Sequence, residues 1–187
     1  MGLSPIKHLI LEAMWTIDKP VKPSEIAKET GRSFPSTMMH IIGLTRMGYA
    51  SSPEKGYYVI TEKGKEALGF PKVDKIKVEE ILAHLPTEKS FHFYANMGKP
   101  LNIYANNLQD FCDKISKIGT DSIEFHINRR DFEAWLNELG DVELARKIEL
   151  IREKKLSGEE LRRKVYETLE SRCITLAKIA GQAPASE

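Results

Sequence analysis

The stretch from Val21 to Leu68 constrains the fold most, because it predicts three helices and a hairpin in close succession. Residues 23–31 read Pro-Ser-Glu-Ile-Ala-Lys-Glu-Thr-Gly, which predicts a short helix that stops at its glycine. Residues 35–49 predict a second helix. Two helices with so few residues between them must cross at a steep angle, so this stretch predicts a helix-turn-helix.

The second of these helices has one apolar face and one outward face. Pro35 suits its first position because no N–H is needed there, and Gly48 can end it in the left-handed conformation. The positions that recur at helical spacing, which we expect to be buried, are Thr37, Ile41, Leu44 and Met47 or Tyr49. The opposite face, which is the candidate reading surface, carries Ser36, Met39, His40 and Gly43.

Two β-prone runs follow this helix. Residues 49–52 and 57–60 flank the turn sequence Pro-Glu-Lys-Gly, so we expect a hairpin. Thr61 then suits the N-cap of another helix that has Glu62 in its first turn. A further helix from Ser4 to Ile17 precedes the whole stretch and carries an apolar stripe at helical spacing.

The order of these motifs resembles the winged helix-turn-helix of prokaryotic transcriptional regulators of the MarR and PadR kind. The matching residues are Ser-Glu-Ile-Ala, a helix ending Met-Gly-Tyr, the hairpin, and Ile-Thr-Glu-Lys-Gly-Lys-Glu-Ala-Leu. The resemblance covers about the first third of the chain. It implies a regulator whose partner is double-stranded DNA, with the remainder of the chain sensing a ligand or mediating assembly.

The resemblance places the DNA contacts on the second helix and on the hairpin of residues 49–60, which forms the wing of such a domain. Phosphates would be held near the start of that helix, which is an anion site, and the wing would reach a neighbouring groove. The candidate residues are Arg32, Ser33, Ser36, Thr37, Met39, His40, Arg46, Lys55 and Tyr57. The helix is unusually apolar for a reader of base edges, so a protein-interaction adaptor that uses the same face is the alternative.

The length, composition and charge of the chain limit which other classes of protein it can belong to. The chain has 187 residues, enough for one large or two small domains, and no run long enough to span a membrane. Its amino terminus does not resemble a secretion signal, so we expect a cytoplasmic protein. Residues 1–70 carry nine basic against seven acidic residues, a net charge of +2, and the remainder carries 19 against 20, a net charge of −1. Neither part is the strongly basic footprint of a tight nucleic-acid binder.

No motif indicates catalysis. The chain has no glycine-rich phosphate loop, no nucleophile elbow and no paired cysteines, so we expect neither enzymatic activity nor a cofactor. Cys112 and Cys173 lie far apart in the sequence, and we interpret them as small buried residues and not as a disulfide or metal site.

We place a domain boundary near Phe70, where Gly-Phe-Pro breaks the chain, and residues 71–86 are either a linker or a connecting helix. Residues 87–187 then predict a small, mainly helical α+β domain, so the whole chain is expected to be α+β. Its first element is a hairpin that pairs residues 91–94 with 101–104. Asn106 or Asn107 caps the next helix, which ends at Gly119, and two short helices follow, the second capped by Asp131.

Residues from about Phe91 to Leu150 resemble an archaeal domain of unknown function. The matching residues are Phe-x-Phe-Tyr, a Leu-x-x-Phe helix, Ser-Ile-Glu-Phe-His, and Arg-x-Asp-Phe-x-x-Trp-Leu. This resemblance implies a domain but no activity. Within it, a small anionic ligand could bind to His92, His126, Arg129, Arg130 and Trp135. The alternative is that His126 and Trp135 pack inside while the arginines are solvated or pair with Glu124 and Glu133. A metal site that joins His84 and His92 to His126 is disfavoured, because no spacing supports it.

The chain ends with two predicted helices. The first runs from Asp141 to Glu153, and the second begins at a capping-box sequence, Ser157-Gly-Glu-Glu. This second helix carries an apolar stripe from Leu161 to Leu176. That stripe is longer than a small domain ordinarily needs for its own core, so it predicts the contact of a homodimer.

Overall fold

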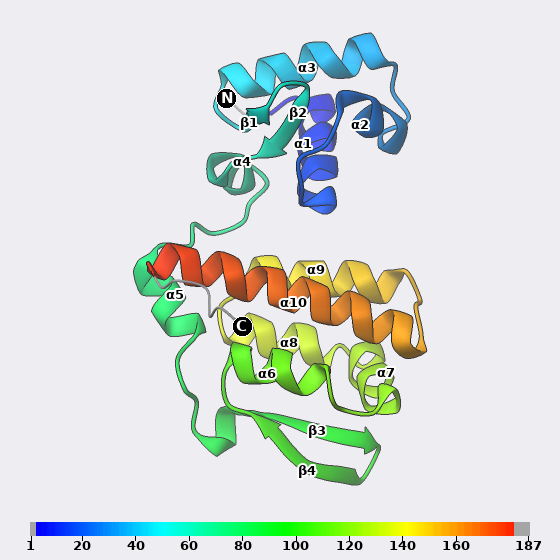
Figure 1. The fold of residues 1–187 in the computed structure, drawn as a ribbon, viewed down its shortest axis with the longest axis vertical. Helices are drawn as coiled ribbons and strands as arrows, with labels where there is room; N and C mark the ends of the chain where they lie inside the picture. The colour runs from blue at the N-terminus through cyan, green and yellow to red at the C-terminus, as the bar shows by residue number, and fades with distance from the viewer. Residues whose placement is uncertain (1–2, 182–187) are drawn as a thin grey trace. The chain divides into compact units, whose positions relative to one another are not determined.

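The computed structural model describes residues 3–181, and these form an α+β fold, as the sequence predicted. The chain divides into two compact units, residues 1–72 and residues 73–187. Each unit has its own hydrophobic core and its own antiparallel hairpin (Figure 1). None of the described helices is long and apolar enough to cross a membrane.

Three helices begin the first unit: α1 (Pro5–Ile17), α2 (Pro23–Glu29) and α3 (Phe34–Arg46). The Ser4 side chain accepts a hydrogen bond from the Lys7 N–H and caps α1. Both α1 and α2 pack against α3. The predicted start of α3 differs by one position, because Phe34 is its first residue and Pro35 its second. The core between the helices consists of Ile10, Leu11, Ala13, Met14, Val21, Ile26, Ile41, Leu44 and Ala50.

The predicted hairpin after α3 is confirmed. Strand β1 (Ala50–Glu54) pairs antiparallel with β2 (Tyr57–Ile60), and Gly56 in the turn has a φ of 85°, which glycine adopts without strain. Thr61 caps α4 (Glu62–Ala67) by accepting a hydrogen bond from the Gly64 N–H, as predicted.

The second unit begins with α5 (Lys75–Ile81), so part of the segment between the two domains is a helix and not only a linker. A short 3-10 turn, η1 (Thr87–Lys89), leads to the second predicted hairpin, which is also confirmed. It pairs β3 (Phe91–Asn96) with β4 (Lys99–Ala105).

Helix α6 (Leu108–Ile115) follows and is capped by Asn107. The prediction that this helix ends at Gly119 was wrong. Helix α6 ends at Ile115, and Ser116 is its C-cap. Gly119 is not left-handed, because its φ is −60°, and it is the N-cap of the next helix.

Four helices complete the unit: α7 (Thr120–Asn128), α8 (Asp131–Glu138), α9 (Val142–Glu153) and α10 (Gly158–Ala180). Asp131 was predicted to cap α8, but it is the first helical residue, and Arg130 holds the cap position with a φ of 65°. The predicted capping box at Ser157 is also absent. Instead Glu124 of α7 accepts the Gly158 N–H at 2.7 Å, so a tertiary contact replaces the local one.

Helices α6 to α10 lie on one side of the β3–β4 hairpin (Figure 1). An aromatic cluster of Phe91, Phe93, Phe111, Phe132 and Trp135 joins them. The stripe on α10 is part of this core: Leu161, Val165, Leu169 and Leu176 are all buried, and the helix packs on α5, α6, α7 and α9. The prediction that this stripe is a dimer contact was therefore wrong, because its own unit covers it.

Candidate functional site

The outward face of α3 is an exposed apolar surface. Phe34 is 53% exposed and Met39 62%, and Ile42 and Met47 are each 38% exposed. A shallow groove of about 520 Å³ follows this face. Its lining consists of Phe34, Pro35, Met38, Met39, Ile42, Gly43 and Arg46. Contiguous apolar surface of this kind commonly marks a binding site.

The stretch of sequence that contains α3 carries no acidic residue. Between Thr30 and Pro53 the sequence has neither aspartate nor glutamate, while Arg32 and Arg46 are exposed. Lys7 of α1 adds a cation beside this face, because its Nζ lies 3.6 Å from the Met47 sulfur. The face is therefore apolar at its centre and positive at its edges, and nothing within that stretch of sequence would repel an anion.

The residues predicted to contact DNA differ in their accessibility. Those on the surface are Arg32, Ser33, Met39, Arg46 and Lys55, and those that are partly covered are Ser36, His40 and Tyr57. Thr37 is 0% exposed, so its inclusion was wrong. Its side chain points into the core, and its backbone N–H donates to the Ser33 carbonyl, which leaves no group for a phosphate.

In the second unit, His126 of α7 has a fixed position. Its Nε2 accepts a hydrogen bond from the Tyr94 backbone N–H at 2.9 Å, and its Nδ1 lies 2.8 Å from Oδ2 of Asp131. Because a backbone N–H can only donate, Nε2 must be unprotonated and Nδ1 must carry the hydrogen. Burial lowers the pKa of His126, and the hydrogen bond to Asp131 only partly opposes this effect. The residue is therefore a neutral structural histidine that joins β3 to the start of α8.

Asp131 also fixes Arg129. The Arg129 Nε donates to the same Oδ2 at 3.2 Å, and the guanidinium lies over the Phe125 ring, 5.1 Å from its centre. These groups line a cavity of about 420 Å³ between the β3–β4 turn and the α7–α8 corner. Its full lining is Phe91, His92, Tyr94, Met97, Gly98, Phe125, His126, Arg129 and Asp131. We call it the α7–α8 cavity.

The structure brings together three of the five predicted ligand residues: His92, His126 and Arg129. Trp135 is elsewhere, because it is buried and its indole N–H donates to the Lys89 carbonyl. Arg130 lines a different cavity, beside Arg152. The alternative interpretation is correct that His126 and Trp135 are buried and that Arg129 and Arg130 are exposed to solvent. Glu133 pairs with Arg152 at 2.8 Å and not with either of these arginines.

Six further residues line the cavity and were not among the predicted ligand residues: Phe91, Tyr94, Met97, Gly98, Phe125 and Asp131. A signal was present for two of them, since Phe125 and Asp131 flank the predicted His126 and Arg129. Tyr94 and Met97 come from the hairpin, about 30 positions earlier, and only the tertiary packing of β3 on α7 brings them near. Among the described residues, no group of three His, Cys, Asp or Glu side chains could hold a metal ion.

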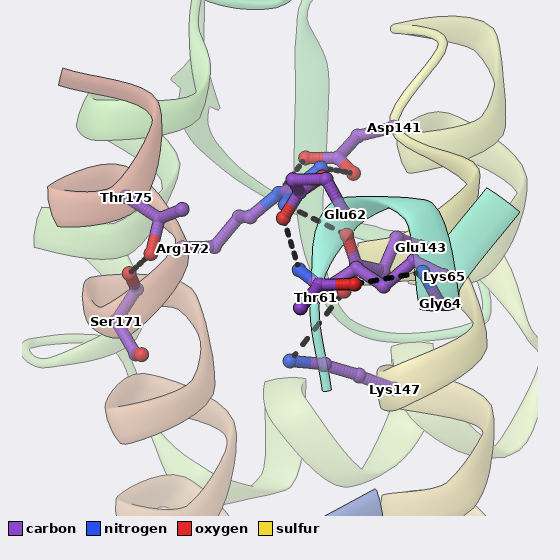
Figure 2. Close-up of polar contacts among 10 residues, drawn as sticks. All are labelled: Thr61, Glu62, Gly64, Lys65, Asp141, Glu143, Lys147, Ser171, Arg172 and Thr175. Carbon is purple, nitrogen blue, oxygen red and sulfur yellow. Dashed lines mark hydrogen bonds and ion pairs between the residues drawn. The ribbon is translucent and has the colours of Figure 1, made fainter. Parts of the chain in front are cut away.

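A buried ion network joins α9 to α10 (Figure 2). Arg172 donates two hydrogen bonds to Asp141, at 2.7 and 2.8 Å, and one to Glu143 at 2.9 Å. All three side chains are at least nine-tenths buried. Asp141 also caps α9 by accepting the Leu144 N–H. Because every charge has a partner, this network fixes the packing of the two helices and leaves no reactive group.

Cys112 of α6 and Cys173 of α10 are both buried and free, as the sequence predicted. The fold nevertheless brings them together: a hydrogen bond with the Cys173 thiol, together with burial, raises the pKa of the Cys112 thiol. A thiol with a raised pKa is a poor nucleophile, so the pair does not indicate a catalytic site.

One comparison with known proteins gave a match. A family model described as a family of unknown function (DUF5752) matches residues 73–170, which is more than half of the chain and begins where the second unit begins. No curated protein and no solved structure matches the chain.

Proposed function

The chain belongs to the family of unknown function DUF5752, and we propose that it is a transcriptional regulator whose first unit is a winged helix-turn-helix that binds double-stranded DNA. One observation carries the proposal. Helix α3 follows α2 after a short turn, the β1–β2 hairpin lies next in the chain, and the stretch from Thr30 to Pro53 has cations but no acids.

Phosphate contacts would supply the affinity. Arg32 and Ser33 precede the amino terminus of α3, where N–H groups and the helix dipole favour an anion. Arg46 lies near the other end of the helix, and Lys55 lies at the turn of the hairpin. These positions place cations at both ends of α3 and on the wing, which is how such a domain follows the backbone on either side of a groove.

Base recognition would be weak. The outward residues of α3 are mainly Phe34, Met39 and Ile42, and none of them offers the paired donors that distinguish guanine or adenine. Apolar side chains of this kind contact thymine methyl groups. We therefore expect a preference for T-rich sites with modest discrimination between them.

The direct test is recovery of bound genomic fragments from cells of the native host, followed by affinity measurements on a recovered duplex. The double variant Arg32→Gln with Arg46→Gln should weaken binding by a similar factor on every sequence, because it removes phosphate contacts. Arg163→Gln is the matched control, since Arg163 is an exposed arginine of α10. Equal affinity of the double variant and the control would contradict the proposal.

The second candidate is a protein-interaction adaptor, and the exposure of Phe34, Met39 and Ile42 favours it. An amphipathic helix with acidic flanks would fit an apolar groove that has arginine at its end. If this candidate is correct, no duplex will bind at low salt. In that case Met39→Ser with Ile42→Ser should abolish partner binding, and Arg163→Gln should not affect it.

A further inference from the structure

The α7–α8 cavity has the size and composition of a small-molecule site. Its volume of about 420 Å³ lies within the roughly 300–1,000 Å³ of typical ligand pockets. Its walls come from two elements far apart in the sequence, the β3–β4 hairpin and the α7–α8 corner. Aromatic and methionine side chains form most of the lining, and few charged groups are present.

The two ionised groups of the cavity keep polar atoms open to solvent, since the Arg129 side chain is 46% exposed and that of Asp131 30%. Asp131 uses one oxygen, Oδ2, for both His126 and Arg129. Among the described residues, its other oxygen has no polar partner, and neither do the Nη1 and Nη2 groups of Arg129. Because Arg129 Nε donates to Asp131 Oδ2 at 3.2 Å, the two ionised groups are adjacent in the cavity.

The charge of the cavity is balanced. His126 is held neutral by the Tyr94 N–H, so Arg129 and Asp131 contribute one positive and one negative charge. A simple anion placed at Arg129 would face the unused oxygen of Asp131. A simple cation placed at Asp131 would face the guanidinium of Arg129. A ligand that carries both charges on neighbouring atoms would avoid both conflicts.

Apart from His92, whose Nε2 lies 2.8 Å from the Thr87 carbonyl oxygen, the rest of the cavity is mainly apolar. Phe125 lies beneath the Arg129 guanidinium, Tyr94 is partly buried, and Met97 in the hairpin turn is 74% exposed. Methionine is flexible enough to fold over different apolar groups, so it can cover a ligand that enters at this end.

We infer that the α7–α8 cavity binds an α-amino acid with a large apolar side chain. The carboxylate of the ligand accepts hydrogen bonds from Arg129, its ammonium donates to the unused oxygen of Asp131, and its side chain packs against Tyr94, Met97 and Phe125. This inference concerns the second unit alone and does not depend on DNA binding by the first.

Calorimetric titration of the full chain with four probes separates the contributions. L-phenylalanine has both charges and the ring, 3-phenylpropanoate lacks the ammonium, 2-phenylethylamine lacks the carboxylate, and glycine lacks the ring. L-phenylalanine should bind at least tenfold more tightly than each of the other three. If 3-phenylpropanoate or 2-phenylethylamine bound as tightly, or if none of the four bound at millimolar concentration, the inference would be wrong.

Variants locate the site. Arg129→Gln should weaken L-phenylalanine binding at least tenfold, because it removes the donors for the carboxylate, and Arg163→Gln should leave the affinity unchanged. Circular dichroism checks that each variant is folded. If Arg129→Gln does not fold, Met97→Ser replaces it, since this exposed side chain contacts the ligand and should reduce affinity several-fold. Unchanged affinity in the folded variant would overturn the assignment.

Discussion

At the scale of single residues, His126 makes the stability of the second unit depend on pH. Its folded pKa lies below the ordinary value of 6.5 because of burial, so the unfolded chain binds the proton more readily than the folded one. The contribution of His126 to the free energy of unfolding should therefore be constant above about pH 6.5. It should fall as the pH drops below that value, by up to about 1.4 kcal/mol per pH unit.

Urea unfolding between about pH 5 and 7, monitored by hydrogen exchange in the second unit, measures this slope. This pH range lies above the range in which carboxylates titrate. His126→Gln should remove the slope, since glutamine can still accept the Tyr94 N–H but cannot be protonated. His84→Gln, which changes an exposed histidine of the same unit, should retain it. A slope that persists in His126→Gln would contradict the assignment.

Arg172 gives a second residue-scale prediction. Its replacement by methionine keeps most of the volume but leaves two buried carboxylates, Asp141 and Glu143, without their arginine. Breaking a buried ion pair from one side typically costs about 3–5 kcal/mol, so we expect a loss of this size in the free energy of unfolding of the second unit. Arg163→Met is the control on the same helix. A loss below about 1 kcal/mol, as for surface ion pairs, would show that the network is more hydrated than its burial indicates.

The sequence supports only part of this residue-scale account. It offered the burial of His126 and Trp135 only as the alternative to a ligand site, and the structure has both side chains buried. It did not predict that Arg172 is buried. An arginine beside an apolar stripe is usually exposed to solvent, and the sequence does not show that Asp141 and Glu143 face this one.

At the scale of elements, two helical glycines of the first unit should respond to alanine in opposite ways. A Cβ on Gly64 of α4 would overlap the Tyr49 carbonyl oxygen and lie 2.7 Å from Ile60 Cγ1. Gly64→Ala should therefore destabilise the unit by about 1–3 kcal/mol. Gly43 of α3 has only the flexible end of Lys7 nearby, at 3.5 Å, so Gly43→Ala should stabilise it by about 0.5–1 kcal/mol.

Hydrogen exchange of the first unit in increasing urea measures both effects. A stabilising Gly64→Ala would mean that α4 can move away from the hairpin at little cost, and it would contradict the close packing described above.

The hairpins and most helix starts could be predicted because their signals are local. Thr61, Asn107 and Asp141 each accept a hydrogen bond from an N–H three residues later, and the turn at Gly56 needs only its own conformation. The predictions for Asp131, Ser157 and the α10 stripe failed because side-chain contacts outside the local cap pattern decide these positions. The Asp131 carboxylate binds His126, Glu124 accepts the Gly158 N–H, and the core of the second unit covers the α10 stripe.

At the scale of the whole molecule, the sequence predicted α+β structure and two successive hairpins, each followed by a helix. Local patterns carry that information. The cavity could be predicted only in part, because His126 and Arg129 are near in sequence, whereas Tyr94 and Met97 join them through the packing of β3 on α7.

If the first unit binds DNA through its cations, as proposed, the affinity for DNA must fall as the salt concentration rises. Binding of the full chain to a recovered duplex, measured by fluorescence anisotropy over a range of salt concentrations, should give log K falling linearly with log salt. Arg32, Arg46 and Lys55 predict a slope of about −3 per bound copy. Arg32→Gln with Arg46→Gln should reduce that slope by about 2, whereas Arg163→Gln should not change it. A slope near zero, or no binding at low salt, would contradict the claim.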